Sequence, residues 1–394
     1  MVVNFEFLDD EPIENVVTCL NYKVDKVVYW GYSEEIQKRR RNTVKFLKTY
    51  CDVQEVEFHI LPKDNLQEIL QSMRKEIQFE QQKESELFFD ITGGEGLLLV
   101  AFGMLAKEFE TPMHLYDIPN QRLIELDEGA QRSISRDVQK QQVELNLKRY
   151  VELWGGSICE AGYQALMRDK DIENDLNLLW KVASEYSEHW SSIISFMMKQ
   201  LNPDHTLFVD KKAGPIKHAF LSLCRKINSA DVLNDFLDRL AELGLITNYD
   251  STHNRYRFQV KNEVVKKYLY GIGYIYEWYA FQHVRRYSDD CGTGVRIDWD
   301  GVVHNDTSID VLNEIDVLSV KGYVPTFISC KSGNLSASGA LHALYELDTV
   351  GKKFGGKYAK KILMVTNEIK GPHVERAKEM GIEIMQYNFL DNLF

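Results

Sequence analysis

Residues 1–127 alternate short apolar runs with longer stretches that have the spacing of amphipathic helices. The helical stretches cover 33–50, 64–83 and 95–109, and the runs between them are rich in Val, Phe, Tyr and Ile. This alternation predicts a parallel sheet covered by helices. Ligands of such sheets bind at the carboxyl ends of the strands. The first part of the chain is therefore predicted to be an α/β domain with its binding site in the turns that follow the strands.

Two further units follow. Residues 128–205 are polar and have helical spacing, and residues 206–265 resemble a small winged helix whose two-stranded wing turns at Asp250–Asn254. A second α/β unit begins with one long predicted helix over about 263–287, followed by a meander of three strands and a strand–helix alternation. We expect three domains that cover 1–145, 146–262 and 263–394.

The charge balance excludes some classes of protein. The chain has 47 basic and 59 acidic residues and a net charge of −12, which argues against a general nucleic-acid coat or a polybasic membrane anchor. A nuclease with a local basic surface stays possible. No apolar stretch is long enough for a transmembrane helix, and the acidic N-terminus lacks the basic start of a signal peptide, so we expect a cytoplasmic protein without membrane contact. The six cysteines form no CxxC pair, which makes a zinc ribbon or a disulfide framework unexpected.

The negative charge is unevenly distributed. Residues 266–394 carry 15 basic and 16 acidic residues, so nearly all of the net charge lies in the first 265 residues. A lysine cluster within 352–361 is typical of a solvated surface. The second helix of the winged-helix unit is acidic, which favours a spacer or dimerisation role over DNA binding. Its charged residues are Asp231, Asp235, Asp238, Arg239 and Glu242.

A glycine-rich turn, Thr92–Gly96, joins a predicted strand to a predicted helix. Its glycines let backbone N–H groups approach an anion at a helix N-terminus, although glycines at such a corner also serve packing alone. The turn is neither a Walker A motif nor GxGxxG. Two other turns are expected at the same edge of the sheet, one of them with Ser33 as the N-cap of the next helix. The predicted ligand pocket consists of Asp9, Asp10, Gly31, Ser33, Thr92, Gly93, Gly94, Glu95 and Gly96.

A second set of residues combines carboxylates with a lysine. Asp316 lies in the middle of one predicted strand, Lys331 near the end of the next strand, and Glu277 on the preceding helix. The period of two residues puts Glu314 on the same face as Asp316, and Ser329 on the same face as Lys331. Mg²⁺ or Mn²⁺ in a nuclease needs oxygen ligands, and a lysine can stabilise the attacking water or the scissile phosphate. The set therefore predicts a metal-dependent nuclease centre.

These motifs carry a resemblance to known families. The C-terminal unit, over about 265–390, resembles the PD-(D/E)XK nuclease superfamily through Glu277, Asp316 and Lys331. The N-terminal unit resembles the Rossmann-like CRISPR-associated sensor domain, called CARF, through the Thr92–Gly94 turn. The order of CARF sensor, helical and winged-helix-like spacer, and restriction-endonuclease-like α/β domain is similar to that of the CARF nucleases of type III CRISPR systems, which cyclic oligoadenylates activate.

The resemblance implies how such a protein works. It implies a homodimer in which two sensor domains share one pocket for cyclic tetra-adenylate, an allosteric activator. Two nuclease domains would face each other across a groove for DNA, RNA or both, in antiviral defence. Asp316 would bind the metal directly, Lys331 would orient water, and Glu277 would complete the metal shell.

The chain departs from the family patterns at two positions. Ser329 stands where the superfamily pattern has an acidic residue, and the carbonyl of Cys330 or the carboxylate of Glu314 or Glu277 is expected to replace that ligand. Glu95 follows the double glycine, and its carboxylate is expected to turn away from phosphates or to contact ribose or adenine. The alternative function is a ligand-sensing transcription regulator that uses the winged helix for DNA and has an inactive nuclease fold.

Overall fold

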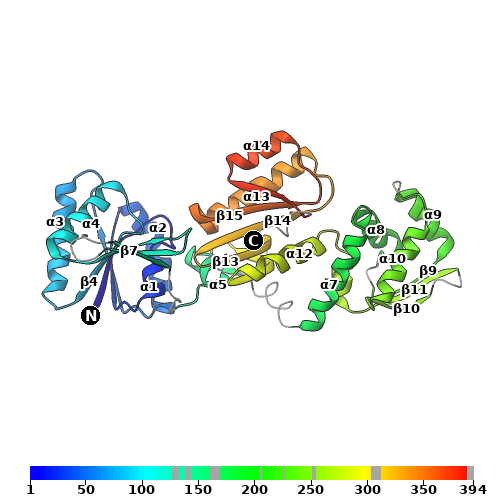
Figure 1. Ribbon diagram of the computed structural model, residues 1–394, viewed down its shortest axis with the longest axis horizontal. Coiled ribbons are helices and arrows are strands. Elements are labelled where there is room, and N and C mark those ends of the chain that lie inside the picture. Colours follow the sequence, from blue (N-terminus) through cyan, green and yellow to red (C-terminus); the bar gives the residue numbers. More distant parts are fainter. Residues whose placement is uncertain are drawn as a thin grey trace.

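The computed structural model describes residues 1–126, 133–137, 143–159, 169–204, 206–224, 227–250, 254–302 and 312–387. They contain three sheets of seven, six and three strands, which are spread along the longest axis of the molecule (Figure 1). The seven-stranded sheet lies at one end, the three-stranded sheet at the other, and the six-stranded sheet between them. The winged-helix part of the predicted spacer therefore lies beyond the six-stranded sheet, on the side away from the seven-stranded sheet.

The N-terminal sheet has the strand order β3-β2-β1-β4-β5-β6-β7. Its first five strands are parallel, and β6 and β7 continue it as an antiparallel ribbon. The predicted parallel sheet is thereby confirmed, with an antiparallel extension that the sequence did not indicate. The strands are β1 (Val2–Phe7), β2 (Lys26–Gly31), β3 (Glu55–Ile60), β4 (Glu86–Asp90), β5 (Met113–Asp117), β6 (Arg122–Leu126) and β7 (Ser133–Asp137).

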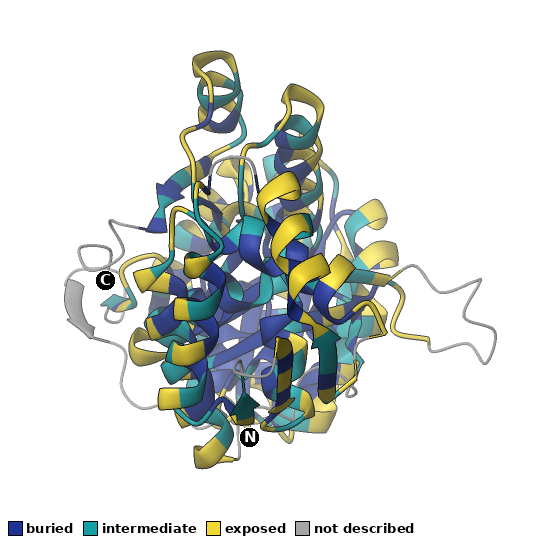
Figure 2. Ribbon diagram, turned by 90° about the vertical axis from the view of Figure 1, so that its right-hand side faces the viewer, coloured by how far each residue is buried: buried dark blue, intermediate teal, exposed yellow. Residues whose placement is uncertain are grey.

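Helices cover both faces of this sheet. Along β1, Val3, Phe5 and Phe7 point to the face that α3 and α4 cover, where they form an apolar core. The opposite face is covered by α1 and α2. In the molecule as a whole, seen from the winged-helix end in Figure 2, buried residues lie in the interior and exposed residues on the outer sides of the helices. These helices are α1 (Val17–Asn21), α2 (Ser33–Tyr50), α3 (Leu66–Gln81) and α4 (Gly96–Phe109).

The C-terminal sheet has the strand order β16-β15-β14-β13-β12-β8. As predicted, β12, β13 and β14 form an antiparallel meander, and β15 and β16 extend it in parallel. The edge strand β8 pairs with β12 although it comes from the predicted spacer range. The elements are β8 (Ser157–Ile158), β12 (Asp290–Asp298), β13 (Leu312–Lys321), β14 (Val324–Lys331), α13 (Ala337–Gly355), the 3₁₀ turn η4 (Gly356–Tyr358), β15 (Lys360–Val365), α14 (Gly371–Glu379) and β16 (Ile382–Gln386).

The spacer unit contains the predicted winged-helix elements. Two helices, α9 and α10, precede the antiparallel wing strands β10 and β11, and β9 pairs with the other side of β11. The tip of the wing, 251–253, lies outside the described residues. The elements are α7 (Lys170–Glu185), α8 (Trp190–Phe196), the π turn η2 (Met197–Leu201), β9 (Phe208–Lys212), α9 (Ala213–Leu223), α10 (Asp231–Glu242), β10 (Ile246–Asp250) and β11 (Arg255–Val260).

Two predicted helices are wrong. The helix expected over about 263–287 is broken into α11 (Glu263–Leu269) and α12 (Tyr274–Val284) at Gly271 and Gly273, because glycine disfavours a helix; the Tyr274 ring fills the space that a side chain on Gly271 would need. The helical prediction for 128–205 fails at β7, which pairs with β6 instead. The parts of that prediction at 128–132, 138–142, 160–168 and 205 lie outside the described residues. None of the helices in the described ranges is long and apolar enough to span a membrane.

One apolar core joins the N-terminal sheet to the C-terminal sheet. It runs from the α1 and α2 face, through α5 (Leu147–Leu153), to the face of the C-terminal sheet that α13 covers. Tyr116 of β5 and Tyr323, in the turn after β13, meet edge to face with ring centroids 6.4 Å apart. A second core joins the spacer to the other face of the C-terminal sheet through α12. The C-terminal sheet is thus packed between the two other units.

Candidate ligand pocket and candidate nuclease centre

The turns after β1 and β4 contact each other directly. The backbone N–H of Gly94 donates to Asp9 Oδ2 at 3.1 Å. The turn after β2 joins them, because the Tyr32 hydroxyl donates to Glu95 Oε2 at 3.2 Å. The side chain of Glu95 is therefore held by Tyr32. The three turns lie together because parallel strands end at the same edge of a sheet.

The double glycine is required by the backbone at this corner. Gly94 has a φ of +120°, which residues with a side chain rarely adopt. A Cβ on Gly93 would lie 3.0 Å from Asp9 Cβ, which is tighter than nine in ten real Cβ contacts, so Asp9 would have to shift. Gly96 opens α4, and a Cβ there would meet no other atom within 4 Å. The turn therefore presents backbone N–H groups at the N-terminus of a 14-residue helix.

Other predicted pocket residues have structural partners. The Thr92 hydroxyl accepts from the N–H of Tyr116 at 2.9 Å and fixes β5 to the turn. Lys38 donates to the Asp10 carboxylate at 2.6 Å, and this hydrogen bond lowers the pKa of Asp10 to about 2. Asp10 is thus bound to α2. Ser33 is the first residue of α2, and Tyr32 occupies the N-cap position in its place. A Cβ on Gly31 would lie 3.3 Å from Leu8 and Ile36, so this glycine serves packing.

The nuclease residues meet on adjacent strands. Asp316 of β13 accepts at Oδ2 from the N–H of Cys330, at 2.6 Å, and from the Ser329 hydroxyl, at 3.2 Å. Lys331 Nζ lies 3.9 Å from the same oxygen. The Asp316 side chain is only 18% exposed, and burial raises its pKa, although Lys331 and the Cys330 N–H oppose the rise. The structure therefore brings a carboxylate, a hydroxyl and an ammonium group together at one point.

Glu277 on α12 faces this point from the second core. Burial, together with the charges of Asp316 and Glu314, raises the pKa of Glu277 to about 8. Glu314 lies on the face of β13 that carries Asp316, but it is half exposed, and Arg296 Nε lies 3.2 Å from its Oε2. Glu277 and Asp316 thus form a pair of partly buried carboxylates whose negative charges repel each other. A divalent cation between them would remove that repulsion.

The predicted metal ligands are not tightly clustered. Among the described residues, one set of three His, Cys, Asp or Glu groups has its ligand atoms within 4.8 Å of one another, and it consists of Glu57, His59 and Glu76 of the sensor domain. Glu277, Asp316 and Glu314 do not meet this criterion together. The Cys330 side chain is buried, so this residue can offer a cation only its backbone carbonyl.

The sequence analysis did not include two residues that lie near Glu277 in the structure. Tyr274 lies one helical turn before Glu277, and its pKa is raised by burial and by the charges of Glu277 and Glu314. Lys267 Nζ lies 4.9 Å from the centre of the Tyr274 ring and its charge acts on Glu277. The spacing of three residues between Tyr274 and Glu277 could have indicated Tyr274. The place of Lys267 depends on the break between α11 and α12, which the sequence analysis did not predict.

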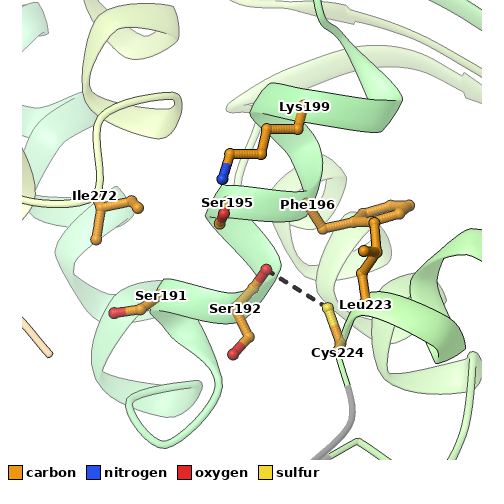
Figure 3. Close-up of a pocket in the computed structure, with 8 residues that line it drawn as sticks. All are labelled: Ser191, Ser192, Ser195, Phe196, Lys199, Leu223, Cys224 and Ile272. Carbon is orange, nitrogen blue, oxygen red and sulfur yellow. Dashed lines mark hydrogen bonds between the residues drawn. The ribbon is translucent and has the colours of Figure 1, made fainter. Parts of the chain in front are cut away.

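A cavity of about 450 Å³ lies in the spacer and contains none of the predicted site residues (Figure 3). It lies between α8, the η2 turn, the end of α9 and Ile272. Cys224 Sγ donates to the carbonyl of Ser192 across 3.6 Å, as the dashed line in Figure 3 marks. The lining residues are Ser191, Ser192, Ser195, Phe196, Lys199, Leu223, Cys224 and Ile272.

Solved structures with the same architecture identify the fold. Protein VC1899 from Vibrio cholerae matches with a TM-score of 0.76 at 16% identity, over 100% of this chain and 96% of that chain. Can2 from Sulfobacillus thermosulfidooxidans, solved in complex with cyclic tetra-adenylate, matches with a TM-score of 0.66 at 15% identity, over 97% and 92% of the two chains. A type III CRISPR defence DNA nuclease activated by cyclic oligoadenylate matches with a TM-score of 0.52 at 11% identity, over 99% of this chain and 50% of that chain. This chain has the CARF-nuclease fold.

The CARF-nuclease fold confirms the fold class predicted from the glycine turn and from the carboxylate–lysine set. No protein-family model matches the sequence, and no curated protein matches it either. The Can2 match extends over almost the whole of both chains, so the likeness includes the sensor, the spacer and the nuclease sheet. In this chain the glycine turn lies at the edge of the N-terminal sheet, and Asp316 with Lys331 lies in the C-terminal sheet.

Proposed function

We propose that this protein is a metal-dependent endonuclease of type III CRISPR antiviral defence, and that cyclic tetra-adenylate activates it. The observation that carries the proposal is the meeting of Asp316, Ser329 and Lys331 at one point of a sheet whose fold is shared with Can2. DNA, RNA or both are its substrates. The alternative is a transcription regulator that binds DNA through the winged helix, and the acidic second helix of that unit, α10, argues against it. The one basic residue of α10, Arg239, is already paired with Glu185 and Glu242.

The residues fit a hard divalent cation, Mn²⁺ or Mg²⁺. Asp316 and Glu277 would hold it, with the Cys330 carbonyl as a neutral ligand and Glu314 at the rim. Such an ion would act as a Lewis acid and would lower the pKa of a bound water. Ser329 fixes the orientation of Asp316 by donating to Oδ2, and therefore supports a ligand rather than replacing one. Lys331 offers a positive charge to the scissile phosphate.

Metal binding is expected to depend on pH through Glu277. Because the pKa of Glu277 is about 8, this group carries a proton at neutral pH and must lose it when the cation binds. We expect the affinity for Mn²⁺ to rise about tenfold per pH unit between about pH 6 and 8, and to level off above that range. Calorimetric titration with Mn²⁺ in buffers of different ionisation enthalpy measures both the affinity and the released proton.

The variant Glu277→Gln isolates this effect. It removes the titrating carboxyl and is expected to weaken Mn²⁺ binding at pH 8 and to abolish the pH dependence. Glu375→Gln, an exposed position on α14, serves as the control and should bind like the wild type. If Glu277→Gln keeps the affinity and the pH profile of the wild type, then Glu277 is not a ligand.

We infer that the protein acts as a homodimer that encloses its activator. The exposed face of α4 carries Leu97, Val100 and Met104, which are 39%, 50% and 50% exposed and lie at the spacing of one helix face. This apolar face begins at the glycine turn, so a second copy packed against it would place two turns around one ligand. A cyclic tetranucleotide with two-fold symmetry matches a pocket on a two-fold axis.

The variant Val100→Asp with Met104→Glu is expected to be a monomer that has lost most of its affinity for cyclic tetra-adenylate, because two buried charges oppose the pairing. Light scattering measures the mass, and calorimetry measures binding. Gln71→Asp with Lys75→Glu introduces acidic residues at the same spacing on the exposed side of α3 and should leave the mass unchanged. A dimeric α4 variant with normal binding would place the interface elsewhere.

The proposed function is tested by incubating the protein with supercoiled plasmid and with single-stranded RNA, in Mn²⁺, with and without cyclic tetra-adenylate. We expect cleavage that needs both the metal and the activator. Binding of the activator without cleavage of either substrate, together with binding to duplex DNA, would favour the transcription regulator. Parallel reactions with EDTA and with linear tetra-adenylate test the need for the metal and for the cyclic ligand.

A further inference from the structure

The loop between β1 and α1, residues 8–16, begins in the candidate ligand pocket. The Asp9 carboxylate accepts from the Gly94 N–H at Oδ2 and from the Glu11 N–H at Oδ1, each at 3.1 Å. Asn15 holds both sides of the Asp9 backbone: it accepts from the Asp9 N–H at 2.7 Å and donates to the Asp9 carbonyl at 2.8 Å. These bonds tie the loop into one rigid unit, so a displacement of Asp9 moves Glu11 and its neighbours as well.

The same loop ends on the nuclease domain. Glu11 Oε1 accepts from the Lys357 N–H at 2.8 Å. Glu14 Oε1 accepts from Lys357 Nζ at 2.9 Å and from the Tyr358 hydroxyl. The Glu14 side chain is 2% exposed, and burial raises its pKa to about 7. Its two polar partners, both on Oε1, compensate only in part for removing this carboxylate from water, because Oε2 is buried without a hydrogen-bond partner.

Gly356 is adapted to this contact. Its φ is +54°, and a Cβ at this position would overlap the Glu11 carboxylate. A side chain at position 356 would therefore displace the Glu11 carboxylate from its hydrogen bond with the Lys357 N–H. Gly381, after α14, has a similar φ of +63°, but a Cβ there would meet no atom within 4 Å. Both glycines have a positive φ, but Gly356 combines it with a ψ of −140°, outside the left-handed helical region, and only Gly356 has a neighbour from the N-terminal domain.

The contacted turn η4 continues the helix next to the nuclease centre. It directly follows α13, which begins six residues after Lys331 and packs on β14 and β15. At its C-terminal end, directly before η4, α13 packs closely on β14: a Cβ on Gly355 would lie 2.8 Å from the Phe327 ring. Movement of η4 is therefore passed to the strand that carries Ser329 and Lys331.

We propose that the β1–α1 loop is the element that couples the ligand pocket to the nuclease centre within each subunit. A phosphate of the ligand and the Asp9 carboxylate are both anions and compete for the Gly94 N–H, so binding displaces Asp9. The rigid loop carries this displacement to Glu11 and Glu14, and through them to η4, α13 and β14. This inference rests on the proposed function, because it assigns the route by which the activator reaches the nuclease centre. Neither Glu11 nor Glu14 touches the ligand or the substrate.

The test compares Gly356→Ala with Gly381→Ala in the full-length protein. Both variants add a side chain to a residue with positive φ, but only Gly356→Ala places it where the Glu11 carboxylate lies. We expect both to bind cyclic tetra-adenylate within about twofold of the wild type. The ratio of the cleavage rates with and without the activator should fall to near one in Gly356→Ala and should stay at the wild-type value in Gly381→Ala.

Two further readouts keep the test decisive. Tyr358→Phe removes a single hydroxyl from Glu14 and is expected to lower the same ratio without changing the melting temperature by more than a few degrees. A Gly356→Ala protein that is folded, binds the ligand and is stimulated like the wild type would overturn the coupling route while leaving the proposed function intact. A wild-type protein that is not stimulated by the ligand would overturn the proposed function and the coupling route together.

Discussion

Replacing Asp316 by alanine is expected to lower metal-dependent cleavage at least about a thousandfold, because the substitution removes the carboxylate that fixes the cation beside Lys331. Binding of cyclic tetra-adenylate should not change, since the glycine turn lies in a different domain. The Cys330 N–H loses its acceptor in this variant, which costs about 1–3 kcal/mol of folding stability. Thermal unfolding therefore has to be measured beside plasmid and RNA cleavage.

Asp316→Asn separates the two effects. Its amide oxygen can still accept from Cys330, so the variant should be as stable as the wild type and nearly as inactive as Asp316→Ala. Lys331→Ala should be almost as inactive, because it removes the positive charge next to Asp316. Cleavage by Asp316→Asn at the wild-type rate would exclude this point of the sheet as the catalytic centre.

The second large effect is expected at the glycine turn. In Gly93→Val, the added carbon atoms would collide with Asp9, whose Cβ lies 3.0 Å from the position of the new Cβ. Asp9 Cβ is attached to the backbone and cannot rotate away, so the turn has to open. Its N–H groups then no longer point toward a phosphate of the ligand. A charge-assisted hydrogen bond contributes about 1.5–3 kcal/mol, and a dimer would lose it twice. We therefore expect binding of cyclic tetra-adenylate to weaken at least about a hundredfold.

Calorimetry and the stimulation of cleavage both measure this loss, while cleavage without the activator should survive in Gly93→Val. Gly103→Ala is the matched control, because this glycine lies in the middle of α4 and a Cβ there would meet nothing within 4 Å. It is expected to bind normally and to be slightly more stable, since alanine is the better helix former. Undiminished binding by Gly93→Val would place the pocket elsewhere on the molecule.

The features that the sequence could predict are local ones. The alternation of β1 and the apolar spacing of α2 and α4 indicate their buried faces, so the sheet could be predicted with its ligand edge. The period of two residues along a strand is also enough to group Glu314 with Asp316, and Ser329 with Lys331. The partners of these residues belong to other elements. The hydrogen bond from Ser329 to Asp316 depends on the register of β13 and β14, which spacing alone does not determine.

One error has its origin in contacts between separate parts of the chain. The lysine cluster at 352–361 was interpreted as a solvated surface, yet Lys361 is buried against Asp348 and Lys357 is bound to Glu14 of the sensor domain. None of these contacts leaves a periodic signal in the sequence. The broken helix before Glu277 has a different, local origin, because Gly271 and Gly273 disfavour a helix at that point.

The apolar core shared by the sensor sheet and the nuclease sheet limits how such proteins can be recombined. A sensor taken from another effector would have to match the surface around Tyr323 and the seat of Glu11 and Glu14, or leave apolar side chains in water. A fragment that lacks residues 1–126 would expose the same surface and should aggregate rather than act as a permanently active enzyme. New ligand specificities are therefore more readily obtained by changing the turns at the edge of the sensor sheet than by exchanging whole domains.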